Sequence, residues 1–281
     1  MKYFLYFFVV LFLFNLNSHA EFVCASTTTR ANIAADEDDT CTVDAEVLNV
    51  TLTKGEFYNV TGSDTKYGNT ASATWVLKTG NQSGDIGGGS SINYMPNITK
   101  GMIKPGTYTH FRGYILPTIS IKGGITTADG YSCVTAGATS NVFFMASSDI
   151  DTLSNKTTVD IVLNNLLGSG SFDSNCGDDS PSAANPCSSL YKVTEGGSIY
   201  DVELLASDGT RATSAAAVAE IRAIITLSSP IVVTENSIVE VEMFFKGTNA
   251  IAIEWSNASS GCDNISSVAP YFSVNVTVTE Q

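Results

Sequence analysis

The residues of this chain with the clearest chemical potential are its cysteines. They are even in number, and no pair has the Cys-x-x-Cys spacing that is typical of zinc and redox sites, so they predict disulfide bonds in an oxidising compartment. Several pairings satisfy that count. The pairs that we expect are Cys24 with Cys41, Cys176 with Cys187, and Cys133 with Cys262.

Acidic side chains form two groups that could bind a cation. Carboxylate oxygens are the ligands that calcium prefers, so calcium is the one cofactor that the sequence suggests. The candidate ligands are Asp36, Asp38 and Asp39 in the first loop and Asp173, Asp178 and Asp179 in the second. Solvated loops without a metal are the alternative, because neighbouring like charges usually face water.

The sequence carries no recognisable catalytic motif. Its one histidine beyond the N-terminal segment is His110, and no Gly-x-Ser-x-Gly motif accompanies it, so a serine hydrolase triad is not expected. A hydrolase with two carboxylates stays open, because the separation of two acids cannot be read from a sequence. Glu240 and Glu242 would share one strand face, which contact with water also explains. We predict no catalytic residues and a protein that is not an enzyme.

The net charge of −14 limits the partners that the chain can bind. An acidic chain without a cluster of Lys or Arg repels phosphate backbones and anionic membranes, so nucleic acid is not an expected partner. A glycan could stack on an aromatic side chain, for which the candidates are Trp75, Tyr94, Tyr108 and Tyr114. Such residues are more often part of a core.

The N-terminus has the pattern of a signal peptide. Lys2 precedes an apolar run at residues 3–14, and Ser18-His19-Ala20 supplies small side chains at the two positions that a signal peptidase reads. The run is shorter than the roughly 20 residues that span a bilayer, and no later stretch is apolar enough to do so. We expect a mature chain that begins at Glu21, lacks a membrane span, and is secreted, periplasmic or held at the cell surface.

The central stretch at residues 104–122 begins with a turn and continues as β structure. Pro105-Gly106 suits the two corners of a turn, and the aromatic and β-branched residues that follow favour an extended chain. Gly113 and Pro117 interrupt the run, so two short strands, or one bulged edge strand, are expected.

Part of this stretch resembles a known kind of module. Ile103-Lys104-Pro105-Gly106-Thr107-Tyr108-Thr109, followed by Arg112, is similar to the turn and strand of secreted bacterial β-sandwich modules, both transthyretin-like surface modules and related uncharacterised exported proteins. The resemblance implies a β-sandwich on an exported protein, where structural or adhesive roles are commoner than catalysis. It assigns no functional residue.

Runs of β-branched, aromatic and other apolar residues, some of them alternating with polar residues, predict further strands. They lie at residues 48–53, 57–60, 73–78, 141–145, 159–163, 199–204, 231–233 and 272–279, with a turn at Lys54-Gly55 between the first two. The glycines of residues 79–91 indicate a loop. The alanine-rich residues 213–224 predict a helix, and residues 238–245 and 251–255 predict a β-hairpin.

These patterns predict an all-β, mainly antiparallel protein, namely a β-sandwich with long loops and one short α-helix. We expect a signal peptide at residues 1–20, a sandwich core at 21–167 and a Cys/Gly/Ser-rich loop or linker at 168–189. The C-terminal β-rich part at 190–281 either completes the same sandwich or forms a second β domain.

The function expected from these features is that of an exported, non-enzymatic structural or adhesive surface protein. The regular strand at residues 271–279 could add to the sheet edge of another copy or of another surface protein, and deletion of residues 271–281 should then abolish assembly. An extracellular glycan- or calcium-binding module is the alternative. A secreted hydrolase with paired carboxylates is the third hypothesis.

Overall fold

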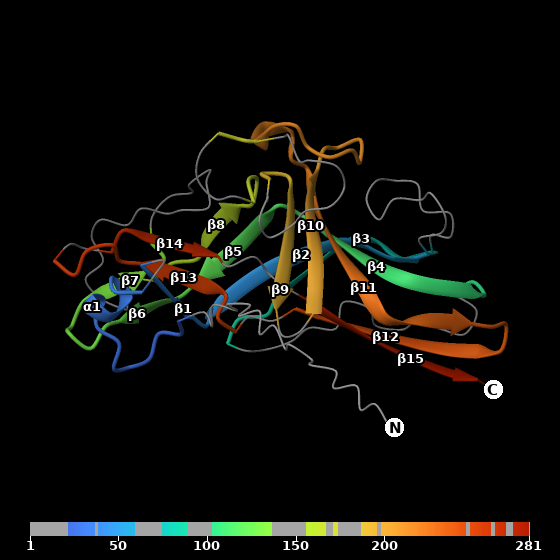
Figure 1. The fold of residues 1–281 in the computed structure, drawn as a ribbon, viewed down its shortest axis with the longest axis horizontal. Coiled ribbons are helices and arrows are strands. Elements are labelled where there is room, and N and C mark those ends of the chain that lie inside the picture. The colour runs from blue at the N-terminus through green and yellow to red at the C-terminus, as the bar shows by residue number, and fades with distance from the viewer. Residues whose placement is uncertain are drawn as a thin grey trace, which may run out of the picture.

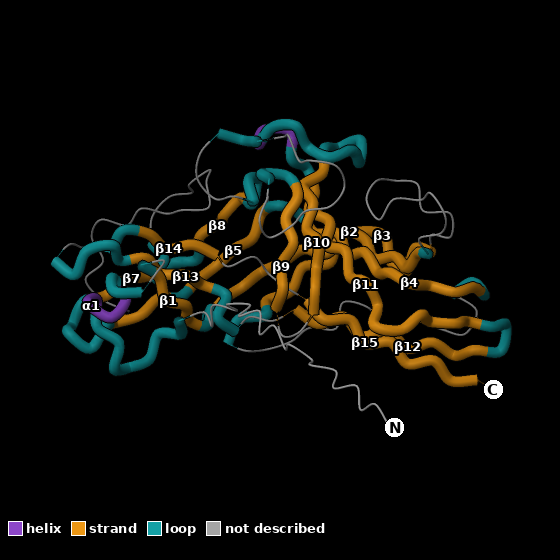
Figure 2. The backbone as a smooth tube through the Cα atoms, viewed as in Figure 1, coloured by secondary structure: helices purple, strands orange, loops and turns teal. Residues whose placement is uncertain are grey.

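The computed structural model describes residues 22–36, 39–59, 75–88, 103–136, 156–166, 171–173, 187–195, 198–245, 248–259, 262–267 and 272–280. The expected signal peptide, the expected strand at residues 141–145 and most of the 168–189 segment lie outside these residues. Strands dominate the described part, as Figure 2 shows, and the pairings between the named strands are antiparallel, which confirms the predicted all-β fold.

The strands of the described residues form four sheets, of eight, three, two and two strands. In chain order the elements are α1 (Arg30–Ile33), β1 (Thr40–Val43), β2 (Val47–Tyr58), β3 (Trp75–Asp85), β4 (Gly106–Ile115), β5 (Thr118–Lys122), β6 (Gly124–Thr126), β7 (Ser132–Val134), β8 (Val159–Val162), β9 (Leu190–Glu195), β10 (Ser198–Leu205), the 3-10 turn η2 (Ala215–Ala217), β11 (Glu220–Val233), β12 (Ser237–Phe245), β13 (Ile251–Glu254), β14 (Asn264–Ser267) and β15 (Phe272–Glu280).

The eight-stranded sheet is built around β2. One edge of β2 pairs with β3, and the other edge pairs with β5 and then with β4, because Asn49 lies opposite both Asp85 of β3 and Ser120 of β5. The sheet continues from β4 through β11 and β10 to β9, while β8 pairs with β5. Twist turns β9 and β10 steeply against β2 and β5, as Figure 1 shows.

The central stretch forms two strands, β4 and β5, as one of the two expectations stated. The alternative of an edge strand is wrong, because β4 lies between β2 and β11. Pro117 falls between the two strands, where its missing N–H costs no ladder bond, and its carbonyl accepts a bond from the N–H of Leu163. The turn before β4 is closed by the hydroxyl of Tyr108, which donates to the carbonyl of Lys104 at 2.9 Å.

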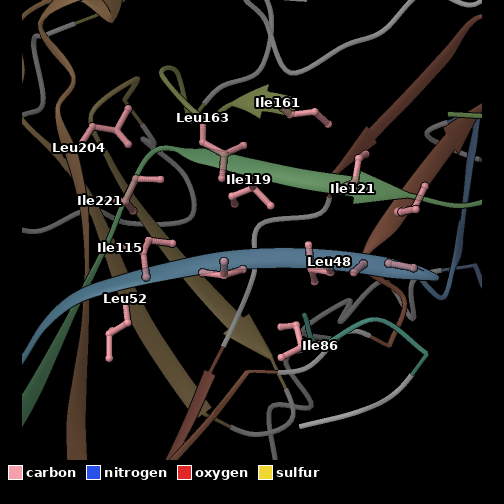
Figure 3. Close-up of a cluster of buried hydrophobic side chains, with 14 of the residues drawn as sticks. Leu48, Leu52, Ile86, Ile115, Ile119, Ile121, Ile161, Leu163, Leu204 and Ile221 are labelled. Atoms are coloured by element: carbon pink, nitrogen blue, oxygen red, sulfur yellow. The ribbon is translucent and has the colours of Figure 1, made fainter. Parts of the chain in front are cut away.

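One face of the sheet carries the main hydrophobic core. Leu52, Ile115, Ile221 and Leu204 form a row across four neighbouring strands, and all are buried. Figure 3 shows these side chains together with Leu48, Ile119 and Ile121. Each large side chain that is fully buried contributes about 1.5–3 kcal/mol, so this face is the main source of stability of the sheet.

A bulge in β2 changes which residues face the core. Two steps from Leu52 to Lys54 match a single step on β4, from Ile115 to Tyr114. Leu48, Val50 and Leu52 therefore lie on the core side before the bulge, whereas even-numbered residues after it lie on the opposite face. The turn predicted at Lys54-Gly55 is wrong, because the change of alternation marks a bulge within one strand.

Two further differences concern the glycine-rich and alanine-rich segments. Residues 79–85, expected in a loop, continue β3 along β2. The helix predicted at residues 213–224 is also wrong: only Ala215–Ala217 form a 3-10 turn, and β11 begins at Glu220. Long-range pairing with β4 and β10 overrides the helical propensity of the alanines, because it places Ile221 in the core.

The described disulfides join Cys24 to Cys41 and Cys133 to Cys262, and both pairings confirm the prediction. Cys187 is also disulfide-bonded, and its predicted partner Cys176 lies outside the described residues. In the described part of the chain, no helix is long and apolar enough to cross a membrane.

The predicted hairpin of residues 238–245 and 251–255 is wrong in its pairing. Both segments are strands, but β12 pairs with β15, whereas β13 lies between β1 and β14 in the three-stranded sheet. β12 and β15 extend together away from the main body to the C-terminal tip in Figure 1. The described part of β12 and β15 thus forms a two-stranded sheet of its own.

Candidate functional site

The face of the main sheet opposite the core carries two rows of charged and aromatic side chains, which we call the charge ladder. The first row crosses the sheet as Lys54, Tyr114, Arg222 and Glu203, and the second as Glu56, Arg112, Ile224 and Asp201. Within each row, no two residues of like charge are direct neighbours. The bulge in β2 creates this ladder, because it moves Lys54 and Glu56 to the face opposite Leu52.

Glu56 is the centre of one half of the ladder. Its Oε1 atom accepts a hydrogen bond from the hydroxyl of Tyr114 at 2.6 Å and lies 2.7 Å from Nε of Arg112. Its Oε2 atom lies 2.7 Å from Nζ of Lys54. Arg112 stacks on the ring of Tyr58 at 4.0 Å, so the buried guanidinium is also covered by an aromatic face.

Glu203 is the centre of the other half. Its Oε2 atom accepts from Nε of Arg222 at 2.8 Å, and its Oε1 atom lies 3.4 Å from a terminal nitrogen of Arg211. Glu203 and Arg222 are each 1% exposed, so both charges of the pair are removed from water. Removing one partner of such a pair leaves an uncompensated buried charge, which is costly.

Burial changes the acidity of the tyrosines in the ladder. Desolvation raises the pKa of Tyr114 to about 12, and it raises the pKa of Tyr58 further. Burial alone would lower the pKa of Arg222, but the charges and hydrogen bonds of Glu203 and Tyr114 together outweigh it and raise that pKa. Both tyrosines therefore stay protonated at neutral pH, so Tyr114 acts as a donor to Glu56.

The ladder holds Glu56 and Glu203 in contact with cations and far from each other. Glu56 and Glu203 belong to β2 and β10, which are separated by β4 and β11. Adjacent strands lie about 4.8 Å apart, so about 14 Å separates these two strands, more than the separation of the two acids in glycosidases. This arrangement is suited to fixing the register of four strands.

The predicted stacking aromatics have different positions. Tyr108 and Tyr114 are 3% and 5% exposed and cannot stack on a glycan, which makes this part of the binding hypothesis wrong. Trp75 lies on β3 opposite Phe57, and Tyr94 is outside the described residues. His110 lies on β4, where Nδ1 is 2.8 Å from the hydroxyl of Thr109 and the ring is 5.1 Å from that of Tyr58.

The predicted calcium ligands are only partly described. Asp36 and Asp39 border α1 and β1, and the carbonyl of Asp39 accepts a bond from the N–H of Trp255. The carbonyl of Asp173 accepts from the N–H of Ser188, and the N–H of Asp173 donates to the hydroxyl of Ser188, whereas Asp38, Asp178 and Asp179 lie outside the described residues. Among the residues that the structure describes, no group of three or more His, Cys, Asp or Glu side chains could hold a metal ion. Calcium binding stays a prediction.

One acidic residue outside these loops has a clear role. Asp129 accepts a hydrogen bond from Nε of Arg30 at 2.9 Å, and the guanidinium of Arg30 stacks on Tyr131. Desolvation alone would raise the pKa of Asp129, but hydrogen bonds from Arg30 and Thr127 outweigh it and lower the pKa to about 2. The contact ties α1 to the loop between β6 and β7.

The C-terminal strand β15 has a different character. Its nine residues pair with β12 in register from Phe272 opposite Phe245 to Glu280 opposite Ser237. Among the described residues β12 is the only strand that pairs with β15, so no described strand is hydrogen-bonded to the other edge of β15. From Phe272 to Thr279 the strand contains no charged residue, no proline and no glycine.

A groove of about 390 Å³ that is lined mainly by aliphatic residues lies along β15. The groove is lined by residues of β15 and by the part of β11 where pairing with β4 is interrupted. These residues are Val274, Val276, Val278, Leu227, Ser229, Pro230, Ile231 and Val232. Five steps from Thr226 to Ile231 on β11 match two steps on β4, so the chain between them bulges out. Val232 at its end is 58% exposed.

Among the other described edge strands, the short strands β1, β6, β7 and β14 contain no charged residue. The remaining ones do: β3 contains Lys78 and Asp85, β8 contains Asp160, β9 contains Lys192 and Glu195, and β12 contains Glu240 and Glu242. Charged residues on edge strands are a common protection against unwanted strand pairing. The uncharged length of β15 therefore distinguishes it from these strands.

Comparison of the chain with protein-family models, with curated proteins and with solved structures gave no match. The resemblance of the segment from Ile103 to Arg112 to transthyretin-like modules thus stays a prediction.

The sequence reasoning missed the charge ladder. One signal could have found it: Glu56, Arg112 and Arg222 each stand beside aromatic or β-branched residues in a strand-forming run, where a charge needs a buried partner. By contrast, the sequence did single out β15, from its strict alternation.

Proposed function

We propose that this chain is an exported, non-enzymatic structural or adhesive surface protein that assembles by β-strand addition at β15. The observation that carries this proposal is the uncharged edge of β15, which has a strand on one side only among the described residues. An incoming strand would satisfy the backbone N–H and C=O groups of that edge.

The disulfides support an extracellular setting for this function. Cys24–Cys41 and Cys133–Cys262 fit an oxidising compartment, in agreement with the expected signal peptide. The second disulfide also joins distant parts of the chain, because Cys133 and Cys262 are 129 residues apart in the sequence. A crosslink across so long a loop restricts the unfolded chain strongly, which suits a protein exposed at a cell surface.

The structure improves the experiment that tests assembly. Deletion of residues 271–281 would remove the partner of β12 and uncover the buried Val239 and Val241, so a loss of assembly could reflect misfolding. A single lysine at the exposed Thr277 leaves the β12–β15 pairing in place and puts a charge on the strand. Thr277→Lys is therefore the better variant.

The measurement is the solution mass of the oxidised chain from Glu21 onward, by light scattering over a range of concentrations. We expect the wild type to form oligomers, Thr277→Lys to be a monomer, and the control Thr118→Lys to behave as wild type, because Thr118 is an exposed residue on β5, which belongs to a different sheet from β15. A wild type that is monomeric at every concentration would refute the proposal. Repeating the series with calcium and with a chelator tests the calcium-binding alternative.

A further inference from the structure

We propose that the strand added to β15 is β15 of a second copy of this chain, paired antiparallel about a twofold axis at Val276. This inference rests on the proposed function, because it names the partner for the same edge. Two copies related in this way present the same surface to each other, which closes the assembly as a dimer.

The sequence of β15 is compatible with pairing to itself. Full overlap of the strand from Phe272 to Glu280 with its own copy requires Val276 to lie opposite Val276 of the second copy. In that register Val274 lies opposite Val278, and Asn275 lies opposite Thr277. Valines thus meet valines and neutral polar residues meet neutral polar residues along the whole strand, apart from its two ends. Any other antiparallel register shortens the overlap.

The charge of the molecule favours self-association at a long uncharged edge, and β15 carries the longest uncharged run among the described edge strands. At a net charge of −14, two copies repel each other, so they approach best where the contact itself is uncharged. Pairing of β12 with its own copy would bring Glu240 and Glu242 of two chains together, and pairing of β8 with its own copy would do the same for Asp160. In the β15 pair, the only charged residue of the strand is Glu280, which lies opposite Phe272 of the second copy at each end.

The valines of β15 add an apolar component to the backbone ladder. Val274, Val276 and Val278 are each partly exposed and line the groove against β11. A twofold axis perpendicular to the sheet keeps the valine rows of both copies on the same side. Cross-strand pairs of β-branched residues stabilise neighbouring strands, so the two rows would form one continuous apolar stripe.

Cysteine crosslinking tests the register directly. Residues opposite each other in an antiparallel pair have Cα atoms about 4.5–5.5 Å apart, within the range of a disulfide. Val276→Cys should therefore form a covalent dimer by itself. Val274→Cys and Val278→Cys are matched controls on the same face: each would be about 14 Å from its own copy, because four residues separate the two positions along the strand.

A mixture completes the test. Neither Val274→Cys nor Val278→Cys should crosslink alone, whereas an equal mixture of the two should, because these positions lie opposite each other. The readout is the covalent dimer on a non-reducing gel after mild oxidation of the folded chain from Glu21 onward, with folding checked by circular dichroism. Added dithiothreitol during the oxidation step serves as the negative control.

The outcomes separate this inference from the proposed function. A dimer in light scattering, with crosslinking at Val276 and in the mixture only, supports both. If Thr277→Lys dissociates the oligomers but Val276→Cys does not crosslink, the self-pairing of β15 is overturned. The proposed function then still holds, with β15 pairing to a different strand edge of the partner. Crosslinking of Val278→Cys alone, or assemblies that grow beyond a dimer, also overturn it. A chain that is monomeric throughout refutes both.

Discussion

The charge ladder and the β15 edge use charge in opposite ways. In the ladder, Glu56 and Glu203 are buried, and each is held by cations from neighbouring strands. On β15, eight successive residues are uncharged, although the strand has a described partner on one side only. The chain has few charged residues, yet several of them are buried in the main sheet, and none lies between Phe272 and Thr279 on β15.

This difference indicates which strand registers are fixed by buried charges. Moving a charged strand by one residue would turn its charge into the core, so the ladder excludes wrong registers of β2, β4, β11 and β10. Moving a neutral strand past a neutral neighbour meets no such penalty. The register of β15 with a partner is therefore set by overlap and by its valines, and it is easier to change by substitution.

The largest expected effect comes from breaking the ladder. Arg222→Met leaves Glu203 buried without its closest cation, and we expect a loss of about 3–5 kcal/mol in the free energy of unfolding, measured in urea. The double variant Arg222→Met/Glu203→Leu should lose less than the single one, because no uncompensated charge remains. A loss below about 1 kcal/mol for Arg222→Met would show that the ladder does not specify the sheet. The mass of Arg222→Met in light scattering should match that of the wild type, because the substitution lies outside β15.

A smaller effect is expected for the hydroxyl of Tyr114. Tyr114→Phe removes the bond to the charged Oε1 atom of Glu56, and we expect a loss of about 1.5–3 kcal/mol. Tyr108→Phe is the matched control, because it is a buried tyrosine on the same strand whose hydroxyl donates to a neutral carbonyl, and about 1 kcal/mol should be lost. Equal losses in urea unfolding would mean that the ladder charges add nothing to this bond.

The next test removes the charges from the strand beside β15. Glu240→Thr/Glu242→Thr makes β12 as neutral as β15, and we expect assemblies larger than those of the wild type, because a second edge becomes available for pairing. Light scattering measures the change in mass, and Glu220→Thr, on a central strand, is the control for the loss of acidic charge. An unchanged mass would show that the charges of Glu240 and Glu242 do not prevent another strand from pairing with β12.

The smallest effect concerns the surface pair of Asp129 and Arg30. The pKa of Asp129 is lowered from 3.8 to about 2 in the folded state, so its contribution to stability is complete above pH 3.8 and disappears as the pH falls to about 2. The thermal midpoint of the wild type should exceed that of Asp129→Asn at pH 5, and the two should converge near pH 2. A difference that does not depend on pH would contradict this assignment.

Local patterns in the sequence predicted most of the strands and both described disulfides. β2, β8, β10 and β15 follow runs in which apolar residues alternate with polar ones, which is the signal that a half-buried strand leaves. Partners were harder to predict. β12 and β13 were expected to pair with each other, yet they belong to different sheets, because alternation reports which face of a strand is buried and not which strand lies beside it.

What the sequence determined by itself is the kind of fold, the presence of disulfides and the neutral, alternating strand at the C-terminus. Each follows from local chemistry: β-branched residues, an even number of cysteines, and an absence of charge. Only the tertiary structure decided that residues 220–224 extend β11, that a bulge carries Lys54 and Glu56 across the sheet, and that Arg222 meets Glu203. The reason is that these contacts join strands far apart in the chain, where the energy of pairing outweighs the preference of any single segment.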